Sequence, residues 1–190
     1  MDDSSIIVLG VDPGTRVTGY GLIRILPTGI APIDYGCIRP PINLLLPKRY
    51  RIIFDALEQL INKFKPTVMA SETQFVAKNV NSAIKLGMAR GMAILAAERA
   101  GLEIYEYPPK RIKEAVVGNG SASKFQVQQM IRTLLQLAKV PEPEDAADAL
   151  AIAICYAHSR RLECTNTLKD YSRTKNRLKR LWKQAASDTA

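Results

Sequence analysis

Hydrophobic positions in the first forty residues are typical of three successive β-strands. Residues 6–11 form a continuous apolar run, which is typical of a central strand covered on both faces, and the run ends at the turn sequence Asp12-Pro13-Gly14. Residues 17–25 and 30–38 are rich in β-branched and aromatic side chains and are separated by a Pro-Thr-Gly turn. The pattern predicts an antiparallel meander.

The pattern then changes to alternating helices and strands. The expected elements are a helix at about 47–65, a strand at 67–71 that ends on Glu72, a helix at about 79–100 and a strand at 102–107. Pro66 and Gly101 provide the stop signals for the two helices. A strand, a helix and a strand in this order predict a parallel, right-handed crossover.

Three further helices are expected in the second half of the chain, at 109–117, about 123–137 and about 144–158. Ser123 and Gln126 have the spacing of a capping box at the start of the second of these helices. The whole order of elements predicts an α/β domain in which helices flank a five-stranded mixed sheet. We expect this domain to span residues 1–158, with residues 159–190 forming a basic C-terminal tail.

The positive net charge of the chain is typical of proteins that bind polyanionic partners. The chain of 190 residues carries a formal charge of +9, and Lys and Arg that neutralise phosphates release condensed counterions. Nine of the 27 basic residues lie in the 159–190 tail, which fits either a short amphipathic helix or a basic arm. Charge alone leaves nucleic acid and an anionic membrane surface both open as partners.

Several classes of protein are disfavoured by what the sequence lacks. No apolar run approaches the ~20 residues that cross a bilayer, and the first residues do not have the pattern of a secretory signal, so we expect no membrane partner and a cytoplasmic location. Cys37, Cys155 and Cys164 show no C-x-x-C spacing, which disfavours a disulfide framework or a zinc knuckle. With His158 as the single histidine, a zinc site or a histidine-based mechanism is not expected.

Four carboxylates are the candidates for chemistry. Asp12 and Glu72 each end an apolar strand, and neighbouring parallel strands would bring both to the same edge of the sheet, where ligand sites of α/β folds lie. Asp145 and Asp148 are three residues apart and so project from one face of a helix. Asp12 also fits a simple turn residue, and Asp145 fits a favourable charge near a helix N-terminus.

Asp148 is harder to explain as a structural residue. The residues around it, Ala146 to Ile154, are apolar nearly all round the helix, and a buried acid needs a partner. A divalent cation such as Mg²⁺ or Mn²⁺ would neutralise several converging carboxylates at once, and paired ions can hold both oxygens of a phosphodiester displacement. Without metal, we expect mutual repulsion to raise at least one carboxyl pKa.

Four sequence blocks together resemble the RuvC family of bacterial Holliday-junction resolvases. They are Val8 to Thr15, Ser71-Glu72 with Phe75 to Asn79, Val116 to Gly118 with Gly120 to Ala122, and Asp145 to Ala151, and the likeness covers about residues 6–158. The resemblance implies an RNase H-like fold and a homodimer whose subunits each nick one strand of a four-way junction in recombination and repair. It also implies paired, symmetric hydrolysis that leaves 5'-phosphate ends.

The same resemblance assigns roles to particular residues. It places a Mg²⁺ site, with two ions per active site and Mn²⁺ as a substitute, on Asp12, Glu72, Asp145 and Asp148. It further implies a branch-migration complex of RuvA and RuvB as a partner and a bacterial cytoplasm as the location. The preferred cleavage sequence and the general base do not follow from the residues.

Four basic residues lie on either side of the loop 118–121, and we call them the basic rim: Lys110, Arg111, Lys113 and Lys124. A solvated surface explains such charges in most proteins, but the resemblance implies that Lys113 and Lys124 contact phosphate, and we expect Lys110 and Arg111 to add to DNA binding. Phe75 follows Glu72 in a polar loop, where core packing and stacking on an unpaired base both fit, and the resemblance favours stacking.

Gly87 and Gly91 lie inside an expected helix, where each costs about 1 kcal/mol relative to Ala. Close helix packing would explain them, either against the sheet or against a second copy of the chain, and the family's dimer favours a shared role.

Two other functions compete with the nuclease. The sequence Asp12 to Thr15 with Gly19 also resembles the phosphate loop of actin-like ATPases and sugar kinases, although those folds need two such domains. A non-catalytic DNA-binding module would explain the basic surface but not the four acidic positions.

Overall fold

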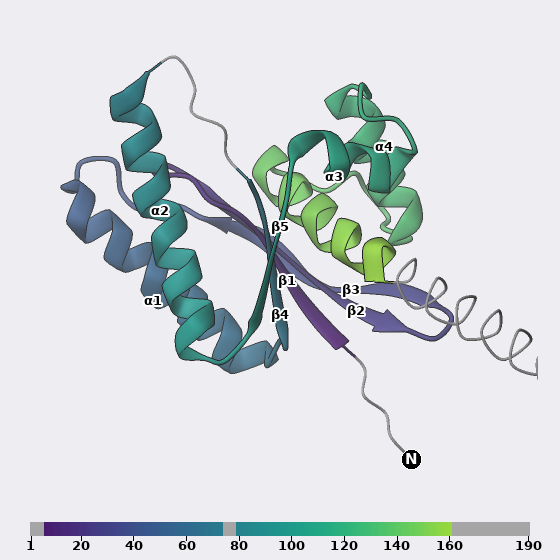
Figure 1. Cartoon of the computed structure of the whole chain (residues 1–190), viewed down its shortest axis with the longest axis horizontal. Coiled ribbons are helices and arrows are strands. Elements are labelled where there is room, and N and C mark those ends of the chain that lie inside the picture. The colour runs from purple at the N-terminus through teal and green to yellow at the C-terminus, as the bar shows by residue number, and fades with distance from the viewer. Residues whose placement is uncertain (1–5, 74–78, 161–190) are drawn as a thin grey trace, which may run out of the picture. The chain divides into compact units, whose positions relative to one another are not determined.

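The computed structural model describes residues 6–73 and 79–160. Its strands are β1 (Ile6–Asp12), β2 (Thr18–Leu26), β3 (Gly29–Ile38), β4 (Val68–Glu72) and β5 (Glu103–Tyr107). Its helices are α1 (Leu46–Phe64), α2 (Val80–Arg99), α3 (Pro109–Val117) and α4 (Lys124–Leu134), followed by a last helix that is described over residues 144–160 (Figure 1). Within these ranges, the helices are too short or too polar to cross a membrane.

The five strands form one mixed sheet in the order β3-β2-β1-β4-β5. β1 pairs antiparallel with β2, β2 pairs antiparallel with β3, and β4 is parallel to both β1 and β5. The predicted meander, the parallel crossover and the neighbouring positions of β1 and β4 are therefore confirmed. Because β1 and β4 run in the same direction, Asp12 and Glu72 end their strands at the same edge of the sheet.

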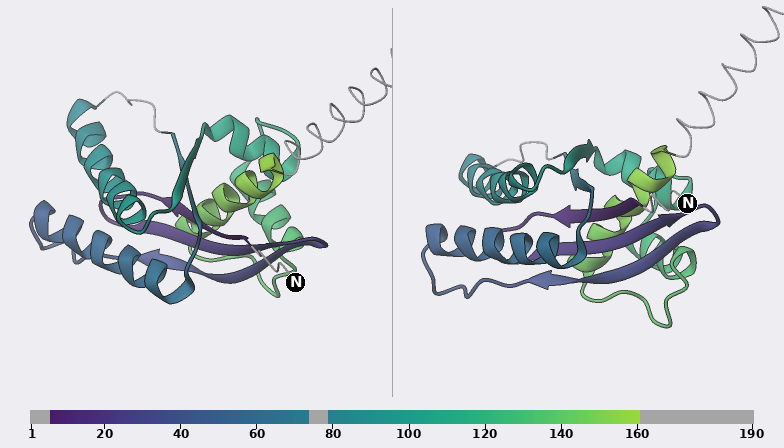
Figure 2. Two further views of the ribbon diagram at one scale, coloured as in Figure 1. Left: turned by 60° about the horizontal axis from the view of Figure 1, so that its bottom comes forward. Right: turned by 90° about the horizontal axis from the view of Figure 1, so that it is seen from below.

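Each face of the sheet is covered by helices. α1 and α2 lie on one face, and α3, α4 and the last helix lie on the other (Figures 1 and 2). Alternate residues of β1 serve the two cores: Leu9 packs with Ile53 and Leu57 of α1, whereas Val8 packs with Leu150 and other residues of the last helix. This two-sided burial explains the continuous apolar run of β1.

The bounds of α1, α2 and α3 agree with the sequence to within one residue, the last helix runs at least two residues beyond its expected end, and α4 is shorter than expected. The capping box of Ser123 and Gln126 is present as expected. The helix ends at Leu134 rather than near residue 137, because Gln136 takes a left-handed backbone conformation with φ of 52°. A left-handed residue cannot continue a right-handed helix, so the chain turns away there.

The last helix lies unusually close to the sheet. A Cβ at Gly10 would collide with the Ala149 carbonyl oxygen, a Cβ at Gly19 with the Asp145 carbonyl oxygen, and a Cβ at Gly21 would lie 2.8 Å from the Leu150 nitrogen. Strands β1 and β2 thus need these glycines so that the helix backbone can rest directly on them. The sequence analysis missed this contact, although glycines inside strands are its usual signal.

Candidate active site: a carboxylate cleft at the edge of the sheet

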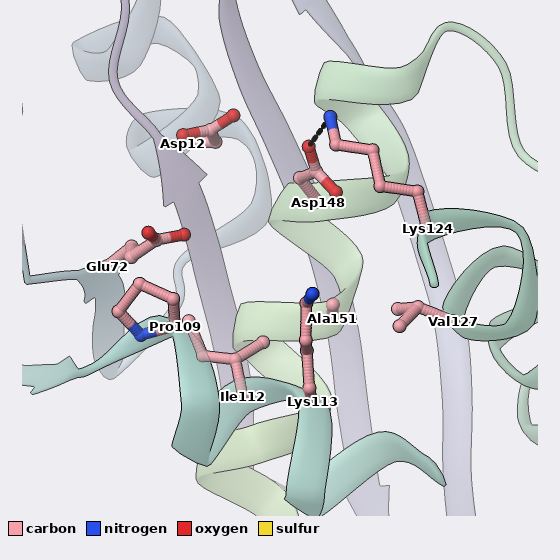
Figure 3. Close-up of a pocket in the computed structure, with 9 residues that line it drawn as sticks. All are labelled: Asp12, Glu72, Pro109, Ile112, Lys113, Lys124, Val127, Asp148 and Ala151. Carbon is pink, nitrogen blue, oxygen red and sulfur yellow. Dashed lines mark ion pairs between the residues drawn. The ribbon is translucent and has the colours of Figure 1, made fainter. Parts of the chain in front are cut away.

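A cleft of about 340 Å³ opens where β1 and β4 end, and its lining residues are Asp12, Glu72, Pro109, Ile112, Lys113, Lys124, Val127, Asp148 and Ala151. Figure 3 shows the carboxylates of Asp12 and Glu72 on the strand side of the cleft and the carboxylate of Asp148 on the last helix, opposite them. Three of the four acidic residues expected from the sequence therefore share one cleft, together with two lysines.

The strand-end carboxylates are placed by the register of the sheet. Val11 of β1 pairs with Ser71 of β4, so Asp12 and Glu72, the next residue in each strand, lie side by side. Asp148 reaches the cleft because the last helix rests on the glycines of β1 and β2 and is buried on nearly every side from Ala146 to Ala157. The expectation that this helix is buried all round is confirmed.

Asp145 lies at the margin of this arrangement and is not among the residues that line the cleft. Its backbone carbonyl faces Gly19, the residue of β2 that pairs with Asp12. Its charge acts on the cleft, because it contributes to the raised pKa of Asp12. Asp145 therefore interacts with Asp12 electrostatically, although it is not one of the residues that line the cavity.

Burial and repulsion among these groups favour their neutral forms. The pKa of Asp12 rises to about 7, first because the group is buried and then because of the charges of Asp148, Glu72 and Asp145. Burial also raises the pKa of Glu72 and of Asp148, with Asp148 adding to the effect on Glu72. The cluster thus holds negative charge that the fold itself leaves incompletely neutralised, and the expected rise of a carboxyl pKa is confirmed.

The two lysines of the cleft are held in different ways. The Lys124 ammonium lies 3.5 Å from an oxygen of Asp148 and 3.3 Å from one of Glu144, and the charge of Asp148 is the main cause of its raised pKa. Lys113 donates a hydrogen bond of 2.9 Å to the carbonyl of Ala122. Lys124 therefore supplies part of the missing positive charge, and Lys113 ties α3 to the loop before α4.

The chemistry of the donor set fits a hard divalent cation. Carboxylate oxygens are the ligands that Mg²⁺ and Mn²⁺ prefer, and a cation here would offset the cost of ionising Asp12 in a buried position. Among the described residues, no three side chains of the acidic, His or Cys types are gathered closely enough to hold one ion together.

The remaining residues expected at the site are spread more widely. Lys110 and Arg111 lie on α3 next to Lys113, but they do not line the cleft. Phe75 lies outside the described residues. The basic rim is thus divided between two lysines that face the carboxylates and two basic residues of α3 that lie outside the cavity.

Sequence analysis missed the buried residue Arg49. Its side chain is only 8% exposed, and its guanidinium donates to the carbonyl of Thr15 in the turn that follows Asp12. The spacing of Arg49, Ile53 and Leu57 placed it on the apolar face of α1, which was the available signal. Arg49 holds the turn next to the first carboxylate.

The raised pKa of Asp12 predicts how stability depends on pH. The ordinary pKa is 3.8 and the pKa in the fold is about 7, so between these values the folded state binds a proton that the unfolded state has released. Without metal, stability should therefore fall from about pH 5 to about pH 8, by roughly 2–4 kcal/mol. Glu72 and Asp148, whose pKa values are also raised, act in the same direction.

Urea unfolding in EDTA at the two pH values measures this loss. Asp12→Asn should be less sensitive to pH than the parent chain, because its amide does not titrate. The same pH dependence in both proteins would show that Asp12 is not the group responsible.

Comparison with protein families gives one match over most of the chain. The family model described as "Crossover junction endodeoxyribonuclease RuvC" matches residues 8–156. A protein of that name from Protochlamydia amoebophila is 55% identical over 154 residues, which make up 81% of this chain and 92% of the relative.

Solved structures agree with this match. The Thermus thermophilus RuvC structure has a TM-score of 0.77 and 30% sequence identity, covering 83% of this chain and 97% of that one. The structure of the same bacterium's RuvC in complex with a Holliday junction substrate has a TM-score of 0.76 and 28% identity, covering 83% and 96% of the two chains. The predicted RNase H-like arrangement is confirmed by these similarities.

Proposed function

The chain belongs to the RuvC family of crossover junction endodeoxyribonucleases, and from this membership we propose that its carboxylate cleft binds the divalent metal ions used to cut DNA. Its activity is the endonucleolytic resolution of Holliday junctions in recombination and repair. The observation that carries the metal site is the meeting of Asp12, Glu72 and Asp148 in one cleft beside two lysines. Neither a phosphate-loop ATPase nor a non-catalytic DNA-binding module accounts for this family membership.

We propose Mg²⁺ as the metal, with Mn²⁺ as a substitute and two ions per active site. Asp12, Glu72 and Asp148 would hold the ions, and Asp145 would join them by turning its side chain from the margin of the cleft. Bound divalent ions supply a nucleophilic water at neutral pH and stabilise charge on the attacking and leaving oxygens. Release of the 3'-oxygen of the scissile phosphodiester would leave the phosphate on the 5' end.

The lysines of the cleft would act on the substrate phosphate. Lys113 and Lys124 are positive groups within the same cavity as the carboxylates, so a phosphate bound there lies between opposite charges. Their ammonium groups would position the phosphate and stabilise charge that develops on its oxygens. Lys110 and Arg111 would bind neighbouring phosphates from outside the cavity, and Phe75 would stack on an unpaired base near the centre of the junction.

A second copy of the chain would cover an exposed apolar face of α2. Val80, Ile84, Met88 and Leu95 are between 47% and 65% exposed, and their spacing places them on one side of the helix. Gly87 and Gly91 lie in the same stripe and have nothing within 4 Å of an added Cβ, so the described part of the chain offers no reason for them. A two-fold dimer through this face would present two active sites to a nearly two-fold junction.

Met88→Glu should convert the dimer to a monomer. A charge in the middle of the apolar stripe has to be desolvated in the interface, and we expect the dimer dissociation constant to rise at least about 30-fold. Sedimentation equilibrium measures the change. Ser82→Glu, which adds the same charge to an exposed position of α2 outside the stripe, is the matched control. If both variants dimerise like the parent chain, another surface forms the dimer.

The metal-dependent activity is tested on a synthetic four-way junction. With Mg²⁺ or Mn²⁺, the purified chain should nick two strands at symmetric positions and leave a linear duplex of the same sequence largely intact. EDTA should stop the reaction, and DNA ligase should reseal the products directly if they carry 5'-phosphate ends. Failure to cut the junction with either metal would contradict the proposed use of divalent ions.

Membership of the RuvC family also suggests a cellular location and protein partners. We propose the bacterial cytoplasm as its location, because its DNA substrate is there. A branch-migration complex of RuvA and RuvB would deliver the junction to the dimer.

A further inference from the structure

A second hollow, of about 440 Å³, lies beside the active-site cleft between α3 and α4. Its lining combines apolar side chains with side-chain amides, chiefly Val117, Ala122, Phe125, Gln126, Gln129 and Met130. We call it the α4 groove. It is separate from the carboxylates, and nothing in the cutting mechanism uses it.

The α4 groove and the cleft share one wall, the first turn of α4. Lys124 and Val127 face the cleft, whereas Phe125 and Gln126, which lie between them in sequence, face the groove. Ala122 is among the residues that line the groove, and its carbonyl accepts the hydrogen bond from Lys113. A DNA strand whose phosphate lies between Lys113 and Lys124 therefore passes next to the groove.

The groove has the chemistry that binds a nucleobase. Phe125 is 67% exposed, although a side chain of this size normally gains from burial, and its ring offers a flat surface for stacking. The side-chain amide of Gln129 makes no hydrogen bond to another described residue, so its donor and acceptor are available. Glutamine can donate to and accept from the edge of one base at once.

Charge around the groove favours DNA over an uncharged partner. The two helices that border it carry Lys110 and Lys113 on α3 and Lys124 and Arg132 on α4. Binding of a polyanion across these elements would release counterions from its backbone. The same charges would oppose a basic protein segment.

We propose that the α4 groove binds one unpaired base of the cut strand, next to the scissile phosphate, with Phe125 stacking on the base and Gln129 contacting its edge. This inference rests on the proposed function, because the base reaches the groove only when its neighbouring phosphate occupies the cleft. The groove is then a determinant of where the junction is cut. An exposed ring beside the active site gains a partner in the complex that it lacks in the free protein.

The test uses the full chain and junctions with 2-aminopurine at single positions around the cut site. Without divalent metal, binding should change the fluorescence strongly at one position within a few nucleotides of the cut. Phe125→Ala should remove that change and weaken junction binding by roughly 5-fold or more, whereas Phe125→Trp should retain both. Because Phe125 is exposed, the melting temperature should stay that of the parent chain.

A matched pair of glutamines tests the contact to the base edge. Gln129→Ala should alter the preference for one base in a set of junctions that differ at that position. Gln128→Ala, on the same helix but outside both cavities, should leave the preference unchanged.

The outcomes separate this inference from the proposed function. If the parent chain fails to cut the junction, the proposed function is wrong. Suppose that the parent chain cuts, and that Phe125→Ala binds and cuts like the parent and gives the same change in 2-aminopurine fluorescence. The groove then holds no base, and a protein partner becomes its better occupant. Equal effects of Gln128→Ala and Gln129→Ala would exclude a base contact by Gln129.

Discussion

Asp12→Asn is expected to abolish cutting of a four-way junction while leaving junction binding intact. Asp12 ends the central strand, lies beside Glu72 and faces Asp148, so it is the carboxylate most surrounded by the others. An amide in its place keeps the size of the side chain but removes the negative charge that a divalent ion needs. Loss of about 4 kcal/mol of transition-state stabilisation corresponds to a rate loss on the order of 1,000-fold.

Binding should change little in the same variant, and in the direction of tighter binding, because one negative charge near the DNA phosphates is removed. The measurements are the single-turnover cutting rate with saturating Mg²⁺ and the junction dissociation constant without metal. Asp55→Asn makes the same chemical change on α1, where Asp55 forms a surface ion pair with Arg51, and should cut normally. An Asp12→Asn variant that cuts at the parent rate would remove Asp12 from the catalytic site.

Much of this site was predictable because each carboxylate marks the position of a structural element. An apolar strand that ends in an acid places that acid at an edge of the sheet, and the crossover rule places β1 beside β4, so the pairing of Asp12 with Glu72 followed from local patterns. Asp148 was predictable for a different reason. Its neighbours are apolar all round, so its acid group had to face a polar cavity.

Other features depended on contacts that no local pattern specifies. Asp145 has the same helical spacing from Asp148 that suggested a shared face, yet only Asp148 is among the residues that line the cleft. The ion pair of Lys124 with Asp148 joins two helices across the cleft and cannot be inferred from their separate sequences. Arg49 and the α4 groove were missed because the sequence analysis weighed charges and motifs, not the exposure of single side chains.

The fold shows the same division between local and tertiary information. Most element boundaries followed from turn residues and periodicity, as in the capping box of Ser123 and Gln126. The early end of α4 depends on the left-handed conformation of Gln136, a position where no glycine indicates such a conformation in advance. The direct contact of the last helix with β1 and β2 is a tertiary feature, and it places Asp148 in the cleft opposite Asp12.

Gly19→Ala is expected to lower both stability and cutting, because the added methyl group collides with the backbone that carries two of the proposed metal ligands. The new Cβ would meet the Asp145 carbonyl oxygen and lie 3.2 Å from the Ala146 nitrogen. Backbone atoms cannot turn aside as a flexible side chain can, so the first turn of the last helix has to move. Overpacking of this kind costs about 1–3 kcal/mol of unfolding free energy.

Activity should fall further than stability does. Displacement of Asp145 and Asp148 by about 1 Å relative to Asp12 is enough to reduce the cutting rate on the order of 100-fold, even in molecules that remain folded. Urea unfolding measures the free energy of unfolding, and single-turnover cutting at saturating metal measures the cutting rate. Junction binding should persist, because the basic residues of α3 do not move with the helix.

Gly87→Ala is the matched control for stability, since it adds the same methyl group where no described atom of the chain lies within 4 Å and replaces a helical glycine. It should stabilise the folded monomer by up to about 1 kcal/mol. Because Gly87 lies in the stripe proposed to pack against a second copy, this control applies to urea unfolding and not to the cutting rate. The changes in unfolding free energy have opposite signs in the two variants, which distinguishes a collision from a general effect of replacing glycine. If Gly19→Ala kept the parent stability and rate, the last helix could not rest on β2 as the structure has it, and the placement of Asp148 opposite Asp12 would lose its physical basis.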